Sequence, residues 1–276
     1  MSDYLVNTIG RTLWGGVLLI GVPVALAWML QRISEGIRTI GVYKCALGYR
    51  CGRAYWYFVA IGVACHETGH AVGAWITGNR VLEFVPFALN REDAPHPGAI
   101  GWIQHTISRG VWGQISGAII CTGPIWFGSL IILLLTRFLV GHKLDVSFYD
   151  YFANGETPGL FEYLVASLRC AILLCCAIAG GALFSGWKTF LWAYLVFCVA
   201  SEIGMSNIDF KLGKVGLCLI LGGVLALLIL PFVGKWIAVG VAILLPKLFI
   251  VHVLMLLAVI INTGFLFLER FLVRVL

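Results

Sequence analysis

The chain has 276 residues, of which 61% are hydrophobic and 12% are charged, with a formal net charge of +6 and a mean hydropathy of +0.97. A soluble domain averages about 45–50% apolar and about 25% charged residues. This composition excludes a disordered chain, a solenoid and an ordinary soluble enzyme, and it predicts an all-α polytopic membrane protein. The positive charge does not indicate nucleic-acid binding, because Lys and Arg lie mostly at helix ends and in connections, where they orient membrane proteins.

Apolar runs long enough to span a bilayer follow one another along the chain. A spanning helix needs about 20 apolar residues, so we expect about six or seven transmembrane helices in one integral membrane domain over 1–276. The runs lie at about 13–31, 55–77, 111–140, 164–183, 187–205, 210–233 and 236–268. The last run is too long for one span, and we expect Pro246 and Lys247 to divide it. The segment 31–54 is basic and is expected to be a loop.

Two connections differ in kind from the others. Residues 141–163 are acidic and rich in turn formers, which predicts an exposed connection. Two stretches rich in β-branched and aromatic residues, Val81 to Ala88 and Ala99 to His105, flank the polar turn NREDAPHPG. We therefore predict a small membrane-associated β-hairpin. An open hairpin is tolerated within a bilayer only against protein or a water-filled cavity.

The run at 55–77 carries the motif H-E-x-x-H, formed by His66, Glu67 and His70. Residues four apart project from one helix face, so two imidazoles can reach one metal ion, and Glu67 can take a proton from metal-bound water. Ionisable residues within a membrane segment are costly and mark functional sites. The alternative is a polar cluster that only packs helices together.

Glycines recur along the same run at Gly62, Gly69 and Gly73. Small residues let neighbouring helices approach closely in membranes. We expect these glycines to mark helix contacts rather than chemistry.

A zinc ion that keeps one position open for water needs a third protein ligand. Asp209 is the first candidate, with a helix cap as the alternative, because Asp favours that position at the start of a helix. Glu202, seven residues earlier, is the second candidate. His105 at the end of the hairpin is a third, and His252 in the last run is expected to make a helix–helix contact instead.

These features together resemble the site-2 protease family of intramembrane zinc metalloproteases. The resemblance rests on H-E-T-G-H with the hairpin behind it, on C-T-G-P-I at 121–125 and on S-N-I-D-F at 206–210, and it covers about 65–210. Many members of the family carry Asn three residues after the Gly-Pro, where this chain has Phe127. The implied division of the chain is a core at about 55–233 with accessory helices at 1–54 and 234–276.

The resemblance implies that zinc is bound by His66, His70 and Asp209, with Glu67 as the general base. It also implies that the substrate is a transmembrane helix of another protein, unwound and bound beside the edge of the hairpin. A strand edge binds an extended peptide through main-chain hydrogen bonds. The expected partners are therefore a transmembrane protein substrate and the lipid bilayer, with no nucleic acid.

Further residues and two other functions stay open at this stage. His105 and Asn207 are side chains that can donate a hydrogen bond to an oxyanion. A membrane metallopeptidase of the Glu-ligand type would use Glu202 in place of Asp209. A scaffold that binds transmembrane helices without cleaving them would need no general base beside its ligands, so the intact Glu67 argues against it.

Overall fold

The computed structural model describes residues 10–46, 51–88, 100–140, 160–179, 186–228 and 231–275. Within them the chain is mostly helical and has one two-stranded antiparallel sheet, as predicted. The helices, two of them π-helical segments (η), are α1 (Gly10–Gly16), η2 (Val17–Gly21), α2 (Val22–Ala46), α3 (Cys51–Ile76), α4 (Gly110–Cys121), α5 (Gly123–Leu135), η3 (Thr136–Val140), α7 (Leu160–Ala179), α8 (Trp187–Glu202), α9 (Asn207–Leu228) and α10 (Pro231–Val275). The strands are β1 (Val81–Val85) and β2 (Trp102–His105).

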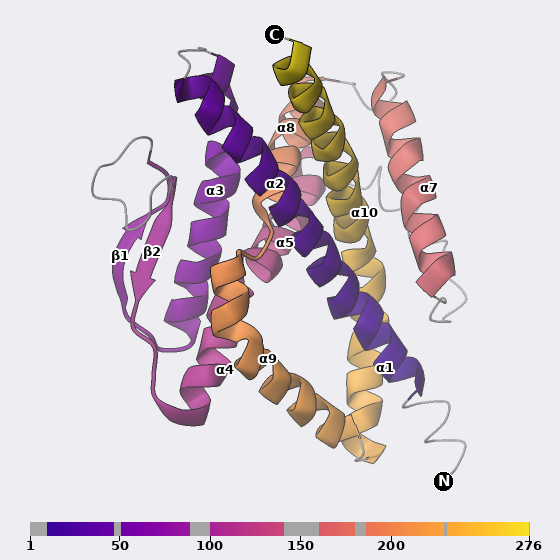
Figure 1. Cartoon of the computed structure of the whole chain (residues 1–276). Coiled ribbons are helices and arrows are strands. Elements are labelled where there is room, and N and C mark those ends of the chain that lie inside the picture. The colour runs from indigo at the N-terminus through magenta and orange to yellow at the C-terminus, as the bar shows by residue number, and fades with distance from the viewer. Residues whose placement is uncertain are drawn as a thin grey trace.

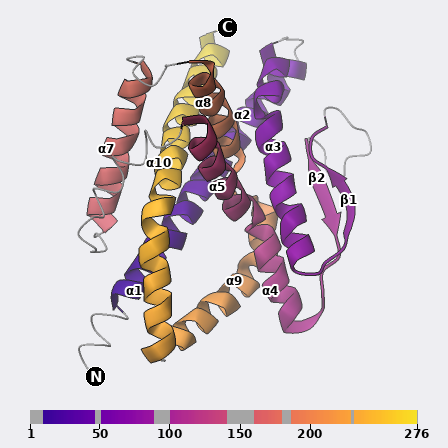
Figure 2. The same ribbon diagram turned by 180° about the vertical axis from the view of Figure 1, so that it is seen from behind.

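The helices form a bundle in which α8 packs against α3, α5 and α10. The hairpin lies on one flank of the bundle beside α3, and α7 lies on the opposite flank beside α10 (Figures 1 and 2). The hydrophobic core lies around α8 and α10, where Trp192, Phe249 and Met255 are almost fully buried. From the middle of the bundle α9 runs diagonally toward the base of α10 (Figure 1).

The helix α2 is longer than the first apolar run. It continues to Ala46, and α3 already begins at Cys51, so the expectation of a loop over 31–54 is wrong for most of that segment. The expectation followed continuous apolarity, which misses a helix with a polar side. Arg32 and Glu35 pair on that side at 3.4 Å, one helical turn apart.

Two prolines divide long apolar segments. A proline within a helix removes the hydrogen bond to the residue four positions earlier. The run 111–140, expected as one segment, breaks at Thr122, and Pro124 is the second residue of the helix that follows. In α10 the axis bends by 46° between Leu245 and Leu248, around the predicted division at Pro246, although the chain stays helical throughout.

Among the described residues, one helix is long and apolar enough to cross a membrane, Gly123–Val140. A second appears if the bent pair Val239–Leu245 and Leu248–Gly264 counts as one span. Of the six or seven spans expected from the sequence, length and composition of the described helices support one or two. Large apolar side chains also cover outer faces of the bundle, with Phe161 on α7 78% exposed and Leu221 on α9 57% exposed.

A tight turn holds the hairpin beside α3. The N–H of Gly78, at φ 74°, donates to the carbonyl of Trp75, and the N–H of Asn79 donates to that of Ala74. This pair of bonds is the Schellman arrangement that ends many helices. The Asn79 side chain is buried, and its Oδ1 accepts the N–H of Ser108 at 3.0 Å, so both ends of the hairpin are tied to the end of α3.

The two strands are shorter than predicted. Their register runs from Val81 opposite His105 to Val85 opposite Trp102, with an irregularity between Val81 and Glu83. Both views show β2 between β1 and α3 (Figures 1 and 2). The predicted turn at 90–98 and the connection at 141–159 lie outside the described residues.

Candidate metal centre

Two side chains of α3 meet one side chain of α9 in the middle of the bundle. The Nε2 atoms of His66 and His70 lie 3.1 Å apart, and Oδ1 of Asp209 lies 3.5 Å from Nε2 of His70. The three ligand atoms all fall within 4.8 Å of one another. His70 is only 5% exposed. These three residues could hold a metal ion.

Each histidine is oriented by a main-chain carbonyl. Nδ1 of His66 lies 2.8 Å from the carbonyl oxygen of Glu202, and Nδ1 of His70 lies 2.7 Å from that of Ile120. A carbonyl only accepts, so both Nδ1 atoms carry the hydrogen. The carbonyls come from the last turns of α8 and α4, where a helix does not supply the usual N–H donor four residues on. In the neutral rings both Nε2 atoms are therefore electron-pair donors.

This arrangement fits a metal ion. Two imidazole lone pairs and a carboxylate oxygen converge, and they repel one another unless a positive charge, either a metal ion or a proton on one ring, lies between them. Zinc binds nitrogen at about 2.0–2.1 Å, so a tetrahedral site separates two ligand atoms by about 3.3 Å. The spacings of 3.1 Å and 3.5 Å lie on either side of this value.

The glycines of α3 explain how neighbouring backbones reach the histidines. A Cβ on Gly62 would lie 2.1 Å from a carbonyl oxygen of α8. A Cβ on Gly123 of α5 would lie 2.3 Å from the carbonyl oxygen of Gly69, and one on Gly73 would lie 2.9 Å from Cα of Ile120. The prediction that these glycines mark close helix contacts is confirmed. These contacts bring α8 and α4, whose last turns contain the two orienting carbonyls, close to the histidines of α3.

Asp209 caps α9 with one carboxylate oxygen and leaves the other facing His70. Its Oδ2 accepts the N–H of Ser206 at 2.8 Å, and its own N–H donates to Oγ of Ser206 at 3.1 Å. This reciprocal pair is a capping box at the start of α9. The other carboxylate oxygen, Oδ1, faces His70. Capping and metal binding therefore do not compete for the same oxygen.

The other candidates lie elsewhere or make other contacts. The Glu202 carboxylate is 3% exposed and accepts the hydroxyl of Ser34 on α2 at 3.1 Å. The group of Glu202 that bonds Nδ1 of His66 is its main-chain carbonyl and not its carboxylate. His252 is buried and bonds the hydroxyl of Tyr163 on α7, which is the expected helix–helix contact. In the described part of the chain, the group of His66, His70 and Asp209 is the one that gathers three possible ligands.

A cavity of about 470 Å³ opens onto this group. His66, His70 and Asp209 line it together with Glu67, and the whole of β2 lines it from the hairpin side. Gly101, just before β2, allows the close approach, since a Cβ there would lie 3.0 Å from Cγ of Glu67. The general base expected from the sequence is therefore at the same cavity as the three possible ligands.

The edge of β2 that faces away from β1 turns toward this cavity. The carbonyl of Ile100 and the N–H of Thr106 both bond across to the β1 side, at 2.7 and 2.9 Å. Alternate residues of a strand send their main-chain groups to the same edge. Gly101, Ile103 and His105 therefore present their N–H and C=O groups to the opposite edge, next to α3.

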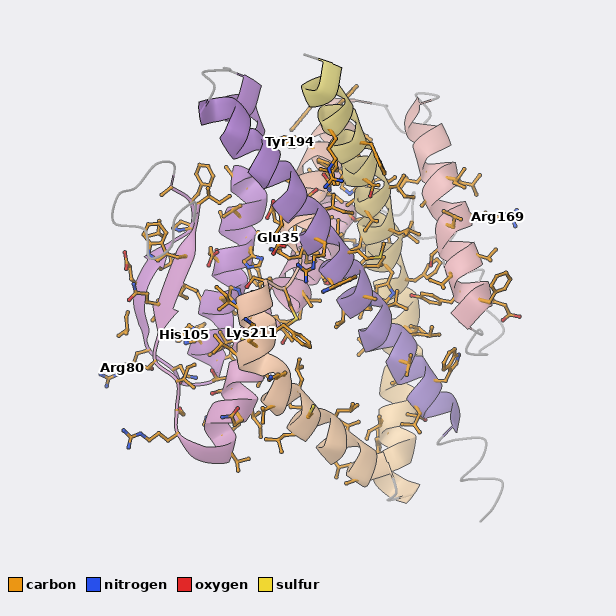
Figure 3. All side chains as sticks on the ribbon, in the orientation of Figure 1. Glu35, Arg80, His105, Arg169, Tyr194 and Lys211 are labelled. Carbon is orange, nitrogen blue, oxygen red and sulfur yellow. The ribbon has the colours of Figure 1, made fainter. Side chains whose placement is uncertain are left out.

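Of the two residues considered as oxyanion donors, His105 lines the cavity. Its Nδ1 lies 3.0 Å from the carbonyl oxygen of Thr106, so the neutral ring offers Nε2 as an acceptor and not as a donor. Figure 3 shows His105 on the hairpin and Lys211 near the start of α9. The side chain of Asn207 lies outside the described residues.

Comparison with known proteins found no match, neither among protein-family models nor among curated proteins or solved structures. The candidate site therefore rests on its own geometry.

The sequence did not predict the roles of the Ile120 and Glu202 carbonyls, because every residue type has a main-chain carbonyl. It also missed Ser34, for which the sequence carries no signal. Pro124 was a usable signal, since a proline frees the carbonyl four residues before it.

Proposed function

We propose that this chain is a multi-pass intramembrane zinc metalloprotease of the site-2 protease type. The observation that carries the proposal is the convergence of His66, His70 and Asp209 on one cavity that also holds Glu67 and the edge of β2. Two histidines with one carboxylate, and a fourth position for water, is a common ligand set of hydrolytic zinc enzymes.

The multi-pass part of the proposal is supported by the composition and by the surface. Seven apolar runs and a mean hydropathy of +0.97 are far from a soluble protein. Exposed leucines, isoleucines and phenylalanines on α7 and α9 are costly in water but neutral against lipid tails. A bilayer is the environment in which this surface is stable.

The residues divide the chemistry among them. Bound zinc would polarise the scissile carbonyl and lower the pKa of a water from about 15.7 to about 7. Glu67 accepts the proton of the attacking water and passes it to the amide nitrogen as the carbon–nitrogen bond breaks. His66 and His70 stay in one tautomer, because each donates its Nδ1 hydrogen to a fixed carbonyl.

The edge of β2 is suited to hold the substrate. A peptide bond within a helix is shielded by its own hydrogen bonds, so the segment to be cut must unwind. The unwound segment can pair with the outward N–H and C=O groups of Ile103 and His105, as an added strand. It would then lie in the cavity that contains Glu67.

The test uses the full chain purified in detergent. We would measure zinc per chain and the cleavage of reporters that carry one transmembrane helix with a central Asn-Gly-Pro segment, for the wild type and for Glu67→Gln. About one zinc in both proteins, cleavage by the wild type, and a loss of at least about 100-fold in the variant is the expected result.

Two outcomes would count against the proposal. Wild-type protein without zinc, even after reconstitution, would rule out a metalloprotease. Zinc without any cleavage, together with tight binding of the reporter helix, would identify a scaffold that binds transmembrane helices.

A further inference from the structure

The break between α4 and α5 removes the helical partner of the Ile120 carbonyl. In an uninterrupted helix the N–H of residue 124 would donate to the carbonyl of Ile120. Residue 124 is a proline, which has no N–H. The Ile120 carbonyl instead accepts the Nδ1 hydrogen of His70 at 2.7 Å. The carbonyl that would accept a main-chain N–H in a continuous helix thus accepts a side-chain N–H from α3 instead.

The N–H of Thr122 is directed at the carbonyls of both Ala118 and Ile120, but the Ile120 carbonyl differs from its neighbours in having a distant donor as well. The carbonyl of Ala118 accepts the N–H of Thr122 at 3.0 Å, and that of Thr122 accepts the N–H of Ile125 at 3.0 Å. The carbonyl of Ile119 accepts the indole N–H of Trp126 at 3.3 Å. All of these donors lie within seven residues of their acceptor, whereas His70 is 50 residues away from Ile120.

The backbone is also brought close enough for this bond. Gly69, next to His70, and Gly123, next to Pro124, touch directly, since a Cβ on Gly123 would lie 2.3 Å from the Gly69 carbonyl oxygen. A Gly-Pro pair therefore does two separate things here. The glycine lets α5 approach α3, and the proline frees the acceptor for the histidine.

We propose that Pro124 is a positioning residue of the metal centre, which acts by withholding a main-chain donor from Ile120 so that its carbonyl orients His70. An N–H at position 124 would compete with the imidazole for the same oxygen. His70 would then lose the bond that keeps its hydrogen on Nδ1 and turns Nε2 toward Asp209. The inference rests on the metal centre of the proposed function, but not on proteolysis.

The test compares Pro124→Ala with a matched control, Pro246→Ala. Both variants remove a proline from a helix and add one N–H, but Pro246 lies within α10 and not between α4 and α5. The full chain in detergent is titrated with zinc alone against a chelator of known affinity, and the thermal unfolding of the metal-free protein is recorded.

We expect Pro124→Ala to bind zinc about 10- to 100-fold more weakly, the usual cost of losing an outer partner of a metal-binding histidine. The melting temperature of the metal-free variant should stay the same or rise, because alanine favours a helix over proline. Pro246→Ala should keep wild-type zinc affinity. A proline that only bends the chain would leave zinc affinity unchanged in both variants.

A second measurement needs no variant. Nitrogen NMR of ¹⁵N-histidine in the metal-free wild type, with His70→Gln to assign the signal, reports which ring nitrogen of His70 carries the hydrogen. A hydrogen on Nδ1 is expected, alone or together with a proton on Nε2, and its bond to the Ile120 carbonyl should be lost in Pro124→Ala. A hydrogen on Nε2 alone in the wild type, or unchanged zinc affinity in Pro124→Ala, would overturn the proposal. Neither result depends on a cleaved substrate, so failure of the protease function would be seen separately.

Discussion

Replacing Gly123 by alanine should disturb the metal centre, although Gly123 contributes no ligand. A Cβ at this position would lie 2.3 Å from the carbonyl oxygen of Gly69 and 3.0 Å from the backbone nitrogen of His70. An ordinary contact begins at 3.4 Å, so α3 and α5 must separate by about 1 Å. Such overpacking costs about 1–3 kcal/mol.

The same separation reaches the histidine through the chain, because Ile120 near the end of α4 lies three residues before Gly123. The bond between Nδ1 of His70 and the Ile120 carbonyl is 2.7 Å long, and an added 1 Å would carry it beyond hydrogen-bonding distance. Zinc affinity should therefore fall by about 10- to 100-fold together with a lower melting temperature. Chelator competition and thermal unfolding of the detergent-purified protein measure the two effects.

Gly222 provides the matched control. It lies within α9, and a Cβ there would have no heavy atom within 4 Å. Alanine is favoured over glycine in a helix by up to about 1 kcal/mol, so Gly222→Ala should be neutral or stabilising. The reasoning fails if Gly123→Ala keeps both zinc affinity and melting temperature, or if Gly222→Ala lowers them equally.

Three further predictions concern the surroundings of the cluster. Asp209→Ala should lose most of the bound zinc, whereas Ser206→Ala, which removes only a capping hydroxyl, should keep it; elemental analysis separates the two. Glu202→Ala should keep zinc stoichiometry but lower the melting temperature by several degrees, because a buried carboxylate–hydroxyl bond is lost. Ser34→Ala loses the same bond and should show a smaller drop in melting temperature. Equal zinc loss in Glu202→Ala and Asp209→Ala would contradict this prediction. Gly101→Ala should lower turnover without loss of zinc, since its Cβ would press on Val63, on the Pro86 carbonyl and on Glu67 at 2.8 to 3.0 Å. Unchanged turnover would show that β2 does not position the base.

Much of the fold could be predicted from the sequence because apolar runs and helix length are directly connected. The helices α3, α7, α8 and α9 fall within a few residues of the predicted runs. The errors arise where apolarity is a poor guide, as in α2, whose later part continues to Ala46 with polar and basic residues. The break at Thr122 was not predicted, because Pro124 entered only as part of the C-T-G-P-I resemblance and not as a residue without an N–H donor.

The site could be predicted as far as side chains define it. The spacing of His66 and His70 on one helix face placed the two imidazoles together. The choice between Asp209 and Glu202 could not be made from spacing, because it depends on where one helix ends and the next begins. Glu202 is the last residue of α8 and turns its carboxylate to α2, whereas Asp209 lies in the first turn of α9 and turns toward His70.

The two orienting carbonyls also set the order in which the centre can form during synthesis. The Ile120 carbonyl follows His70 by 50 residues, and the Glu202 carbonyl follows His66 by 136 residues. At about 5–20 residues per second, the second interval takes the ribosome roughly 7–27 s. During that time α3 carries its motif without the partners that orient it, so the metal centre of the proposed function cannot assemble until α8 and α9 have joined it.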